Sequence, residues 1–474
     1  MKAISQIPGL LRCSTEIHCM IFESLSAEDF YGLFWACKFL NEFTEPYLYS
    51  EIQLNWRKHS RPPRILSLVK SILSKPYLAN EVKGLTLGKH GGESMRSVAT
   101  IRDVRPKVDE VDLEQLIEVI KTFKNIDYGD FWIRQLRNGN LDAFVAVLLC
   151  KLPNLIYFRL DPNFLHDSRV VGLVLTSTLD RDTNCGFAFF QRLQYVSFNE
   201  TSLGRFRYKD SDPYDILMLF YFPNILCLSA TLYIPIDFGW EPASPPVIST
   251  LTSLDLDMVS TFVLRRILSF TTGLKILRWR WHRFDDCGTT VEYDEIMSAL
   301  SSVQNTLTML TISAENEVVD ENSSPITVRG SLDGLVSFAF LKRLEINLEF
   351  LAGSFSNYRL SYIPRFGRIL RFERIVPRNI EVLTLTDGKE LEWRNHINYT
   401  MVASAVLSWL KIWKTLTPHL RSIRFLLTYD YQESDSTPIR DPYKLDRTMR
   451  QFLDKLSARA GVEIEVRRIF RTDL

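Results

Sequence analysis

The chain has 474 residues, with 57 Lys and Arg against 56 Asp and Glu, so its formal net charge is +1. Proteins that bind bulk nucleic acid or an anionic membrane usually carry a basic excess, so this balance argues against both partners. Seven scattered cysteines are typical of free thiols in a reducing compartment, not of a disulfide framework. Uninterrupted apolar runs are far shorter than the ~20 residues that span a bilayer. We therefore expect an intracellular chain, cytoplasmic, nuclear or both.

Residues 14–56 have the pattern of three short helices followed by a strand. Apolar residues recur at helical spacing in the first helix, at Ile17, Met20, Ile21 and Leu25. Ser26 followed three residues later by an Asp has the spacing of a capping box, which predicts the start of a second helix. A core of this size is too small for comfortable independent folding, so such a module is expected to lean on a neighbour or a partner.

The same stretch resembles the F-box of fungal F-box proteins. Three pieces match the family pattern in order, TEIHCMIFESL at 15–25, ACK at 36–38 and YLYSEI at 47–52. The family usually has Leu-Pro at the start, where this chain has Cys13-Ser14. The resemblance implies an F-box-like module over residues 10–56 that binds the adaptor subunit of an SCF-type cullin–RING ubiquitin ligase. Carried over by position, the adaptor contacts would be Cys13, Ile17, Ile21, Leu25, Phe30 and Phe34.

A six-residue frame recurs through the rest of the chain, with apolar residues at its first, fourth and sixth positions. The segment 274–279 (LKILRW) is the clearest copy, and 251–256 (LTSLDL) has the same form. Repeats spaced about 20–50 residues apart outweigh local propensity in deciding a fold. Eleven copies occur at intervals of 23 to 41 residues, beginning at Val82, Phe123, Leu155, Leu193, Ile225, Leu251, Leu274, Leu307, Leu341, Ile380 and Leu420.

Amphipathic helices are expected before most copies of the frame, so the hydrophobic period alternates between helix and strand. A helix followed by a strand at each step predicts an α/β fold with a parallel sheet. This pattern resembles the leucine-rich repeat family in its long, irregular form. The resemblance implies a solenoid over residues 65–470, with parallel strands on its concave side and helices on its convex side. A helix at 444–460 and a strand at 462–466 would close it.

Strand side chains alternate, so the fifth residue of each frame is expected to point away from the core. A polar surface on a rigid sheet suits recognition of a protein better than recognition of an apolar ligand. In chain order these residues are Asp127, Arg159, Ser197, Ser229, Asp255, Arg278, Thr311, Glu345, Thr384 and Arg424.

The centre of this surface combines acidic and basic residues. Asp255 and Asp257 are expected to face Arg278 and Arg280 on the next strand, about 4.8 Å away. Two interpretations remain open. The four can form a cross-strand ion-pair ladder. Alternatively they can bind a target protein together with Trp281, since Trp and Arg are common at binding hot spots.

The sequence holds no recognisable catalytic or metal-binding motif, so we expect neither an enzyme nor a cofactor. The predicted function is the substrate-recognition subunit of an SCF-type cullin–RING ubiquitin ligase, monomeric outside the complex. Its module would bind the adaptor, and through it a cullin, while the solenoid would bind a target protein and act by proximity. The alternative is a non-catalytic leucine-rich-repeat scaffold whose N-terminal helices only cap the solenoid. The Cys13-Ser14 pair favours that alternative.

Overall fold

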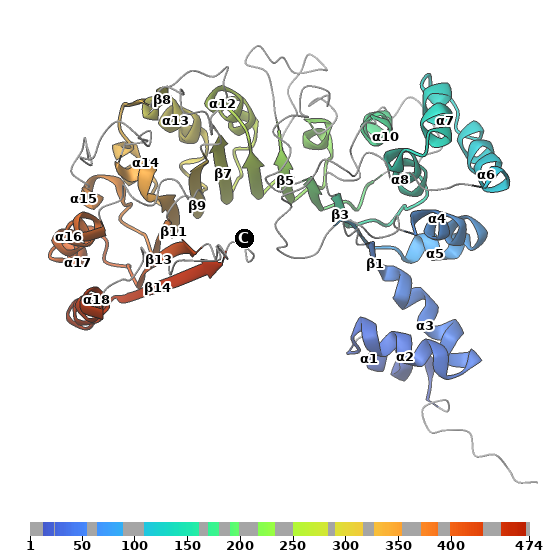
Figure 1. The fold of residues 1–474 in the computed structure, drawn as a ribbon, viewed down its shortest axis with the longest axis horizontal. Helices are drawn as coiled ribbons and strands as arrows, with labels where there is room; N and C mark the ends of the chain where they lie inside the picture. The colour runs from blue at the N-terminus through green and yellow to red at the C-terminus, as the bar shows by residue number, and fades with distance from the viewer. Residues whose placement is uncertain are drawn as a thin grey trace, which may run out of the picture.

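The protein is an α/β structure built on a parallel sheet of 12 strands. The computed structural model describes residues 13–22, 24–54, 64–88, 109–160, 169–179, 190–198, 217–232, 250–282, 290–315, 327–352, 371–386, 399–429 and 447–470. In this part of the chain the strands follow one another across the sheet in sequence order. The sheet curves into an arc, with strands on the inner side and helices on the outer side (Figure 1).

The strands are short, and most alternate between buried and more exposed side chains. A separate parallel pair, β8 (Thr290–Glu292) with β10 (Thr327–Arg329), lies outside the main sheet. The strands of the main sheet are β1 (Glu51–Leu54), β2 (Gly84–Leu87), β3 (Tyr157–Leu160), β4 (Tyr195–Phe198), β5 (Cys227–Thr231), β6 (Ser253–Asp257), β7 (Ile276–His282), β9 (Met309–Glu315), β11 (Arg343–Asn347), β12 (Val382–Thr386), β13 (Ser422–Tyr429) and β14 (Glu463–Phe470).

In the described part of the chain, helices lie between most successive strands and cover the outer face of the sheet (Figure 1). Short 3-10 helices also occur, at η4 (Met218–Tyr221), at η5 (Ser301–Val303), which directly continues α13, and at η6 (Asp333–Ser337). The α-helices of this layer are α4 (Ile65–Ser74), α5 (Pro76–Glu81), α6 (Glu110–Lys121), α7 (Gly129–Arg137), α8 (Leu141–Leu149), α10 (Val170–Leu179), α12 (Thr261–Phe270), α13 (Tyr293–Leu300), α14 (Leu348–Ala352), α15 (Phe372–Ile375), α16 (Tyr399–Leu410), α17 (Trp413–Leu416) and α18 (Arg447–Ala460).

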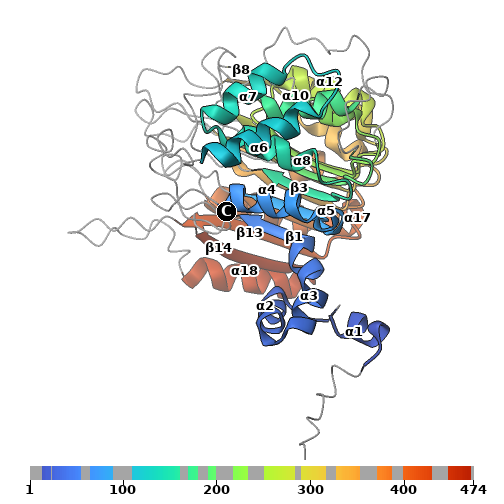
Figure 2. The same cartoon turned by 90° about the vertical axis from the view of Figure 1, so that its right-hand side faces the viewer.

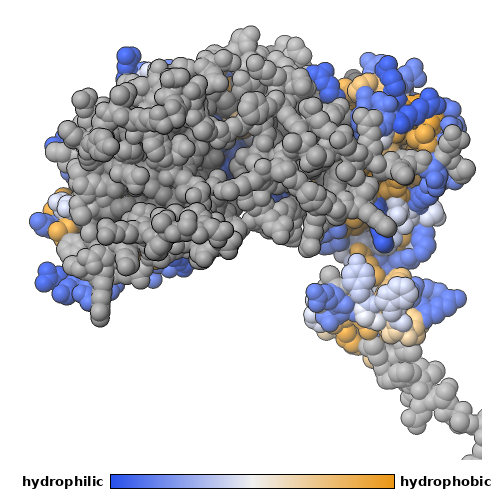
Figure 3. Space-filling model, viewed as in Figure 1, coloured by the Kyte–Doolittle hydropathy of each residue, from blue (hydrophilic) through white to orange (hydrophobic). Residues whose placement is uncertain are grey.

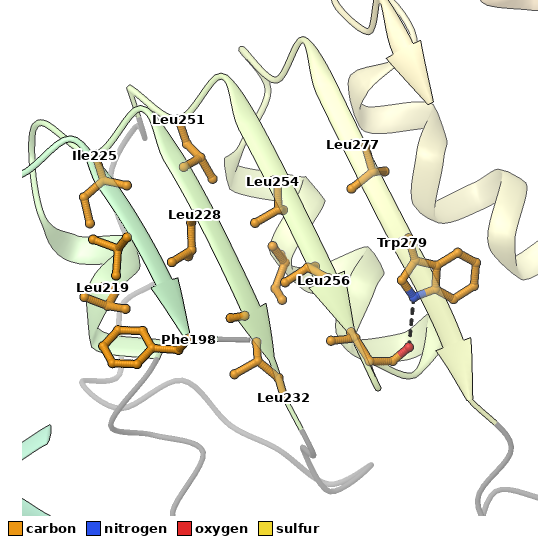
Figure 4. Packing of buried hydrophobic residues seen from close by; sticks show 14 of the residues in the cluster. Phe198, Leu219, Ile225, Leu228, Leu232, Leu251, Leu254, Leu256, Leu277 and Trp279 are labelled. Carbon is orange, nitrogen blue, oxygen red and sulfur yellow. Dashed lines mark hydrogen bonds between the residues drawn. The ribbon is translucent and has the colours of Figure 1, made fainter. Parts of the chain in front are cut away.

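The apolar positions of the six-residue frame form one continuous core between the sheet and the helices. In the clearest copy, Leu274, Leu277 and Trp279 are almost completely buried. The indole nitrogen Nε1 of Trp279 donates a hydrogen bond of 3.0 Å to the carbonyl of Val259 (Figure 4). Burying Trp279 therefore leaves no polar atom of its ring unsatisfied.

The frame at Phe123 is the one copy that does not form a strand, so the strand predicted there is wrong. The chain turns after Phe123, with Asn125 at a φ of 57°, and α7 follows. The buried ring of Phe123 stacks on Trp132, with centroids 5.8 Å apart and planes 9° from parallel. Asp127 consequently has no place in the sheet, and β2 pairs directly with β3. Apolar residues three apart fit a helical turn as well as a strand, so the frame alone could not distinguish the two.

Side-chain hydrogen bonds link neighbouring strand units where the strands begin. In five copies, the residue just before the frame is Asn or Thr. Its side chain donates a hydrogen bond to a backbone carbonyl of the preceding strand unit, two positions before that unit's frame begins. Each bond contributes about 0.5–1.5 kcal/mol net. The bonds join Asn154 to Asn80 (2.8 Å), Asn224 to Gln191 (2.6 Å), Thr250 to Pro223 (2.9 Å), Thr306 to Thr272 (3.0 Å) and Asn379 to Ala339 (2.5 Å).

The three predicted N-terminal helices are present as α1 (Thr15–Phe22), α2 (Ala27–Ala36) and α3 (Lys38–Ser50), here called the helical module. The module has a small core of its own, formed by Phe22, Phe30 and Leu40. Tyr47 stacks on Phe30, with ring centroids 5.2 Å apart. The predicted capping box at the start of α2 is also confirmed. The module projects from the β1 end of the arc (Figures 1 and 2).

The helical module is joined to the sheet and to the region around α5. Helix α3 runs directly into β1, which pairs with β2. Beside this junction, the carboxylate of Glu45 accepts bonds from Lys75 Nζ at 2.5 Å and from the Tyr77 hydroxyl at 2.6 Å. The module is thus linked covalently, by polar contacts and by Tyr49 of α3, which packs against the main core, while the module's own apolar core remains a separate cluster.

Candidate functional site

The helical module exposes large apolar side chains from all three of its helices. Their exposed fractions run from 41% for Phe39 to 80% for Trp35. Ile17 and Met20 on α1 are three residues apart, and Tyr31 and Trp35 on α2 are four apart, so each pair shares one helix face. Apolar residues of the module also reach the surface in Figure 3. We call this set the module surface; it consists of Ile17, Met20, Tyr31, Trp35 and Phe39.

The structure divides the six expected adaptor contacts into three groups. Ile17 is exposed, and Cys13 and Phe34 are half-buried. Ile21 and Leu25 are half-buried and pack against the module's core. The sixth residue requires a correction.

Phe30 is a core residue and is not available to a partner. It is 8% exposed and lies between the rings of Phe22 and Tyr47. The correction extends to α1, which buries His18 and Phe22 instead of the face containing Ile17. Residues four apart on either face of a short, largely apolar helix satisfy the same periodicity, so the sequence pattern did not identify the buried face.

Four members of the module surface were not among the expected contacts. Tyr31 and Trp35 lie on an exposed side of α2, away from the buried Phe30, while Met20 lies on α1 and Phe39 on α3. A second apolar stripe on an amphipathic helix is the signal that identifies such residues.

One residue from each of the 12 strands forms a row that is polar throughout. It occupies the face of the sheet opposite to the core, because side chains alternate along each strand. The fifth residue of each frame, predicted to point away from the core, lies in this row in every copy except the one with Asp127. The polar row consists of Gln53, Thr86, Arg159, Ser197, Ser229, Asp255, Arg278, Thr311, Glu345, Thr384, Arg424 and Glu465.

Asp257, two residues beyond the polar row, is the centre of a buried charged cluster. Its two carboxylate oxygens lie 2.6 Å from Arg280 Nη1 and 2.5 Å from His282 Nε2. Burial raises the pKa of Asp257, but the hydrogen bond to His282 and the charge of Arg280 outweigh it, so the pKa lies below its usual value. The expected pairing of Asp257 with Arg280 is therefore confirmed, and both carboxylate oxygens are occupied within the fold.

Trp281 does not belong to this polar surface. It is 9% exposed and is part of the main core, on the same side of β7 as Leu277 and Trp279. Strand side chains alternate, so Arg278 and Arg280 point to the opposite face. The expectation that Trp281 contacts a target protein is corrected accordingly.

For Arg278 and its neighbours in the polar row, the structure does not decide between an ion-pair ladder and a binding surface. Arg278 faces Asp255 in the register of β6 and β7, but the two form no ion pair. The side chains of Arg278 and Glu345 form no ion pair or hydrogen bond with any described residue, and the buried Thr311 hydroxyl between them has no hydrogen-bond partner there either. Burial raises the pKa of both Asp255 and Glu345, although Arg278 opposes the shift at each. We call Asp255, Arg278, Thr311 and Glu345 the central polar site.

Comparison with known proteins does not assign this geometry to a family. No family model matches the chain, and no curated protein gives a significant match to its sequence. Within the described ranges, no three or more His, Cys, Asp or Glu side chains are grouped as metal ligands. Among the helices described above, none combines the length and apolarity required to cross a bilayer. The module surface and the central polar site are therefore the features from which function is inferred.

Proposed function

We propose that the protein is the substrate-recognition subunit of an SCF-type cullin–RING ubiquitin ligase. Residues 10–56 form an F-box-like module that binds the adaptor, and through it a cullin. Residues 65–470 form a leucine-rich-repeat-like solenoid whose inner face holds a target protein. The chain itself performs no chemistry; it raises the effective concentration of the target at the ligase's catalytic subunits.

The module surface is the observation that carries this proposal. Among the described residues, the module's apolar core has three buried members, while five large apolar side chains face solvent. Removing such surface from water is favourable by about 25 cal/mol per Å². Trp and Tyr also dominate the energetics of protein interfaces. A partner that covers Trp35, Tyr31 and their neighbours would provide the burial that the module lacks.

The same observation weighs against the scaffold alternative. A cap stabilises a solenoid by covering the open end of its core with its own apolar face. Here Phe22, Phe30 and Leu40 form a cluster separate from the main core, and the module surface faces solvent. The polar bonds of Glu45 and the contact of Tyr49 with the main core hold the module in place, while its own apolar core does not merge with that of the sheet.

The solenoid part of the proposal is supported by the order of the sheet. Twelve parallel strands, β1 included, succeed one another in sequence order, and one hydrophobic cluster runs beneath them. Such an arrangement presents an extended inner face built from one or more residues per strand, as in other repeat proteins.

Binding of the purified adaptor to the full-length chain tests the proposal. Trp35→Ala should weaken binding about 30-fold, because a hot-spot residue contributes about 2 kcal/mol or more. Ile17→Asp should weaken it at least as much, since it places a charge in the interface. Phe340→Ala is the matched control, because Phe340 is an aromatic residue 56% exposed outside the module.

Two outcomes would contradict the proposal. If the wild-type chain fails to retain the adaptor at micromolar concentrations, the protein is not a ligase subunit of this kind. If Trp35→Ala and Ile17→Asp bind like Phe340→Ala, the adaptor uses a different surface. Circular dichroism of each variant verifies that the module remains folded.

A further inference from the structure

A second row on the inner face lies beside the polar row, two residues closer to the strand starts. Five of its six residues over β3 to β9 are apolar or aromatic, whereas the polar row beside them has none. Tyr195 is 39% exposed, and the others are half-buried. We call this row the apolar strip; it consists of Tyr157, Tyr195, Cys227, Ser253, Ile276 and Met309.

The spacing of the apolar strip fits an α-helix lying across the strands. Neighbouring strands are about 4.8 Å apart, so the six strands offer side chains over about 24 Å. Side chains on one face of a helix recur every three or four residues, about 4.5–6 Å, and about 16 residues cover 24 Å. Same-face side chains of an extended chain are about 6.6 Å apart, which does not match the strand spacing of about 4.8 Å beyond two positions. The strip therefore favours a helical ligand.

The central polar site determines which charges that helix should carry. Arg278 follows Ile276 by two residues, so it lies beside the strip, and Glu345 is two strands further on. Neighbouring charges are already paired, as in Asp257 with Arg280 and Arg424 with Glu465. A half-buried carboxylate without a cation costs stability unless a ligand supplies one. Arg278 is exposed and forms no ion pair with the described residues, so its guanidinium can contact an anionic side chain.

On the basis of the proposed target-binding role of the inner face, we infer that it binds an amphipathic helix of the target protein. The apolar side chains of this helix lie on the strip, an acidic side chain contacts Arg278, and a basic side chain contacts Glu345. Arg278 and Glu345 are two strand spacings apart, about 9.6 Å. Helix residues seven apart share a face and lie about 10.5 Å apart, so the acidic and basic residues are seven positions apart.

Synthetic peptides test this inference with the purified chain and without the adaptor. Three 18-residue helical peptides share one leucine stripe and differ at two flanking positions seven residues apart, which hold Glu and Lys, Glu twice, or Lys twice. Fluorescence anisotropy should show the Glu/Lys peptide binding wild type at least tenfold more tightly than the other two. Because both orders of charge are possible for a helix that binds in either direction, only the charge composition is compared.

Charge reversal in the protein should redirect the preference. Glu345→Arg, which leaves two cations, should prefer the Glu/Glu peptide, and Arg278→Glu should prefer the Lys/Lys peptide. Arg265→Glu makes the same charge change on the exposed outer side of α12 and should keep the wild-type preference. Absence of binding by the Glu/Lys peptide would overturn the inference, as would variants whose preference does not change. A proline-interrupted Glu/Lys peptide that binds equally well would exclude a helical ligand.

These results are separable from the proposed ligase function. Arg278→Glu and Glu345→Arg leave the module untouched and should bind the adaptor as wild type does. Failure of the peptides with intact adaptor binding therefore refutes the helix inference alone.

Discussion

Replacing the buried Asp142 with alanine should destabilise a junction between two neighbouring helices. Asp142 lies in the first turn of α8 and is 1% exposed. Its carboxylate accepts hydrogen bonds from the backbone N–H groups of Val170, at 2.8 Å, and Val171, at 3.3 Å, where α10 begins. The first N–H groups of a helix have no acceptor within the helix, so Asp142 caps α10 from another element.

The magnitude follows from these two bonds. A hydrogen bond to a charged group contributes about 1.5–3 kcal/mol, so these two contribute about 3–6 kcal/mol before the cost of burial is counted. Removing the carboxylate also removes the cost of burying it, so we expect a net loss of about 2–4 kcal/mol. Asp130→Ala is a matched control, because Asp130 is the second residue of α7 as Asp142 is of α8, but it is exposed. That variant loses only the interaction with its own helix terminus, about 0.3–1 kcal/mol.

Urea unfolding followed by circular dichroism measures the loss, and amide hydrogen exchange locates it. Exchange should accelerate over residues 170–179 in Asp142→Ala and remain unchanged there in Asp130→Ala. The local measurement matters because long arrays of similar units do not always unfold in one step. The capping role is refuted if Asp142→Ala is no less stable than Asp130→Ala and the α10 amides keep their protection.

Three further changes test other parts of the structure. Asn379→Ala removes the hydrogen bond to the Ala339 carbonyl and should lower the free energy of unfolding by about 0.5–1.5 kcal/mol. Asn305 is exposed, and an effect no larger than that of Asn305→Ala would count against the link between strand units. Glu345→Gln should raise the urea midpoint at pH 7, because burial places the folded-state pKa of Glu345 above its unfolded value of about 4.3. The cost of the carboxylate is then present at neutral pH and disappears as the pH falls below the unfolded pKa, so equal gains at pH 7 and pH 4 would contradict this reasoning. Gly330→Ala should cost about 1–3 kcal/mol, since φ is +78° and the added Cβ would lie 2.7 Å from the Asp294 carboxylate. Gly461→Ala, with a φ of +70° and open space around it, should cost less in the same urea titration.

The gain expected for Glu345→Gln also bears on function. A group that lowers the stability of the free protein and faces the inner surface is typical of a binding site, where the ligand compensates for the cost. Glu345→Gln should therefore stabilise the chain while weakening its binding of the Glu/Lys peptide.

Much of the sheet could be predicted from the sequence because its determinants are local. Side chains alternate along a strand, so three apolar positions in six residues, as in 274–279, identify both the strand and its buried face. Aligning successive frames then predicted the register of Asp255 with Arg278, which β6 and β7 have in the structure. The capping box at Ser26 was equally readable, since both of its partners lie within one helical turn.

The tertiary structure decided what depends on residues far apart in the chain. At the Phe123 frame the chain turns and Phe123 stacks on Trp132, nine residues away, and Trp281 lies on the core side because its strand continues past the frame. On the module, a short apolar helix can bury either face, and only packing against α3 chose Phe30 for the core and left Trp35 exposed. The cap that Asp142 provides to α10 joins residues 28 positions apart. The sequence alone thus determined where strands form and which of their side chains are buried, because alternation is a property of the chain itself. The surfaces available to partners were decided by packing, because exposure depends on neighbours that no local pattern specifies.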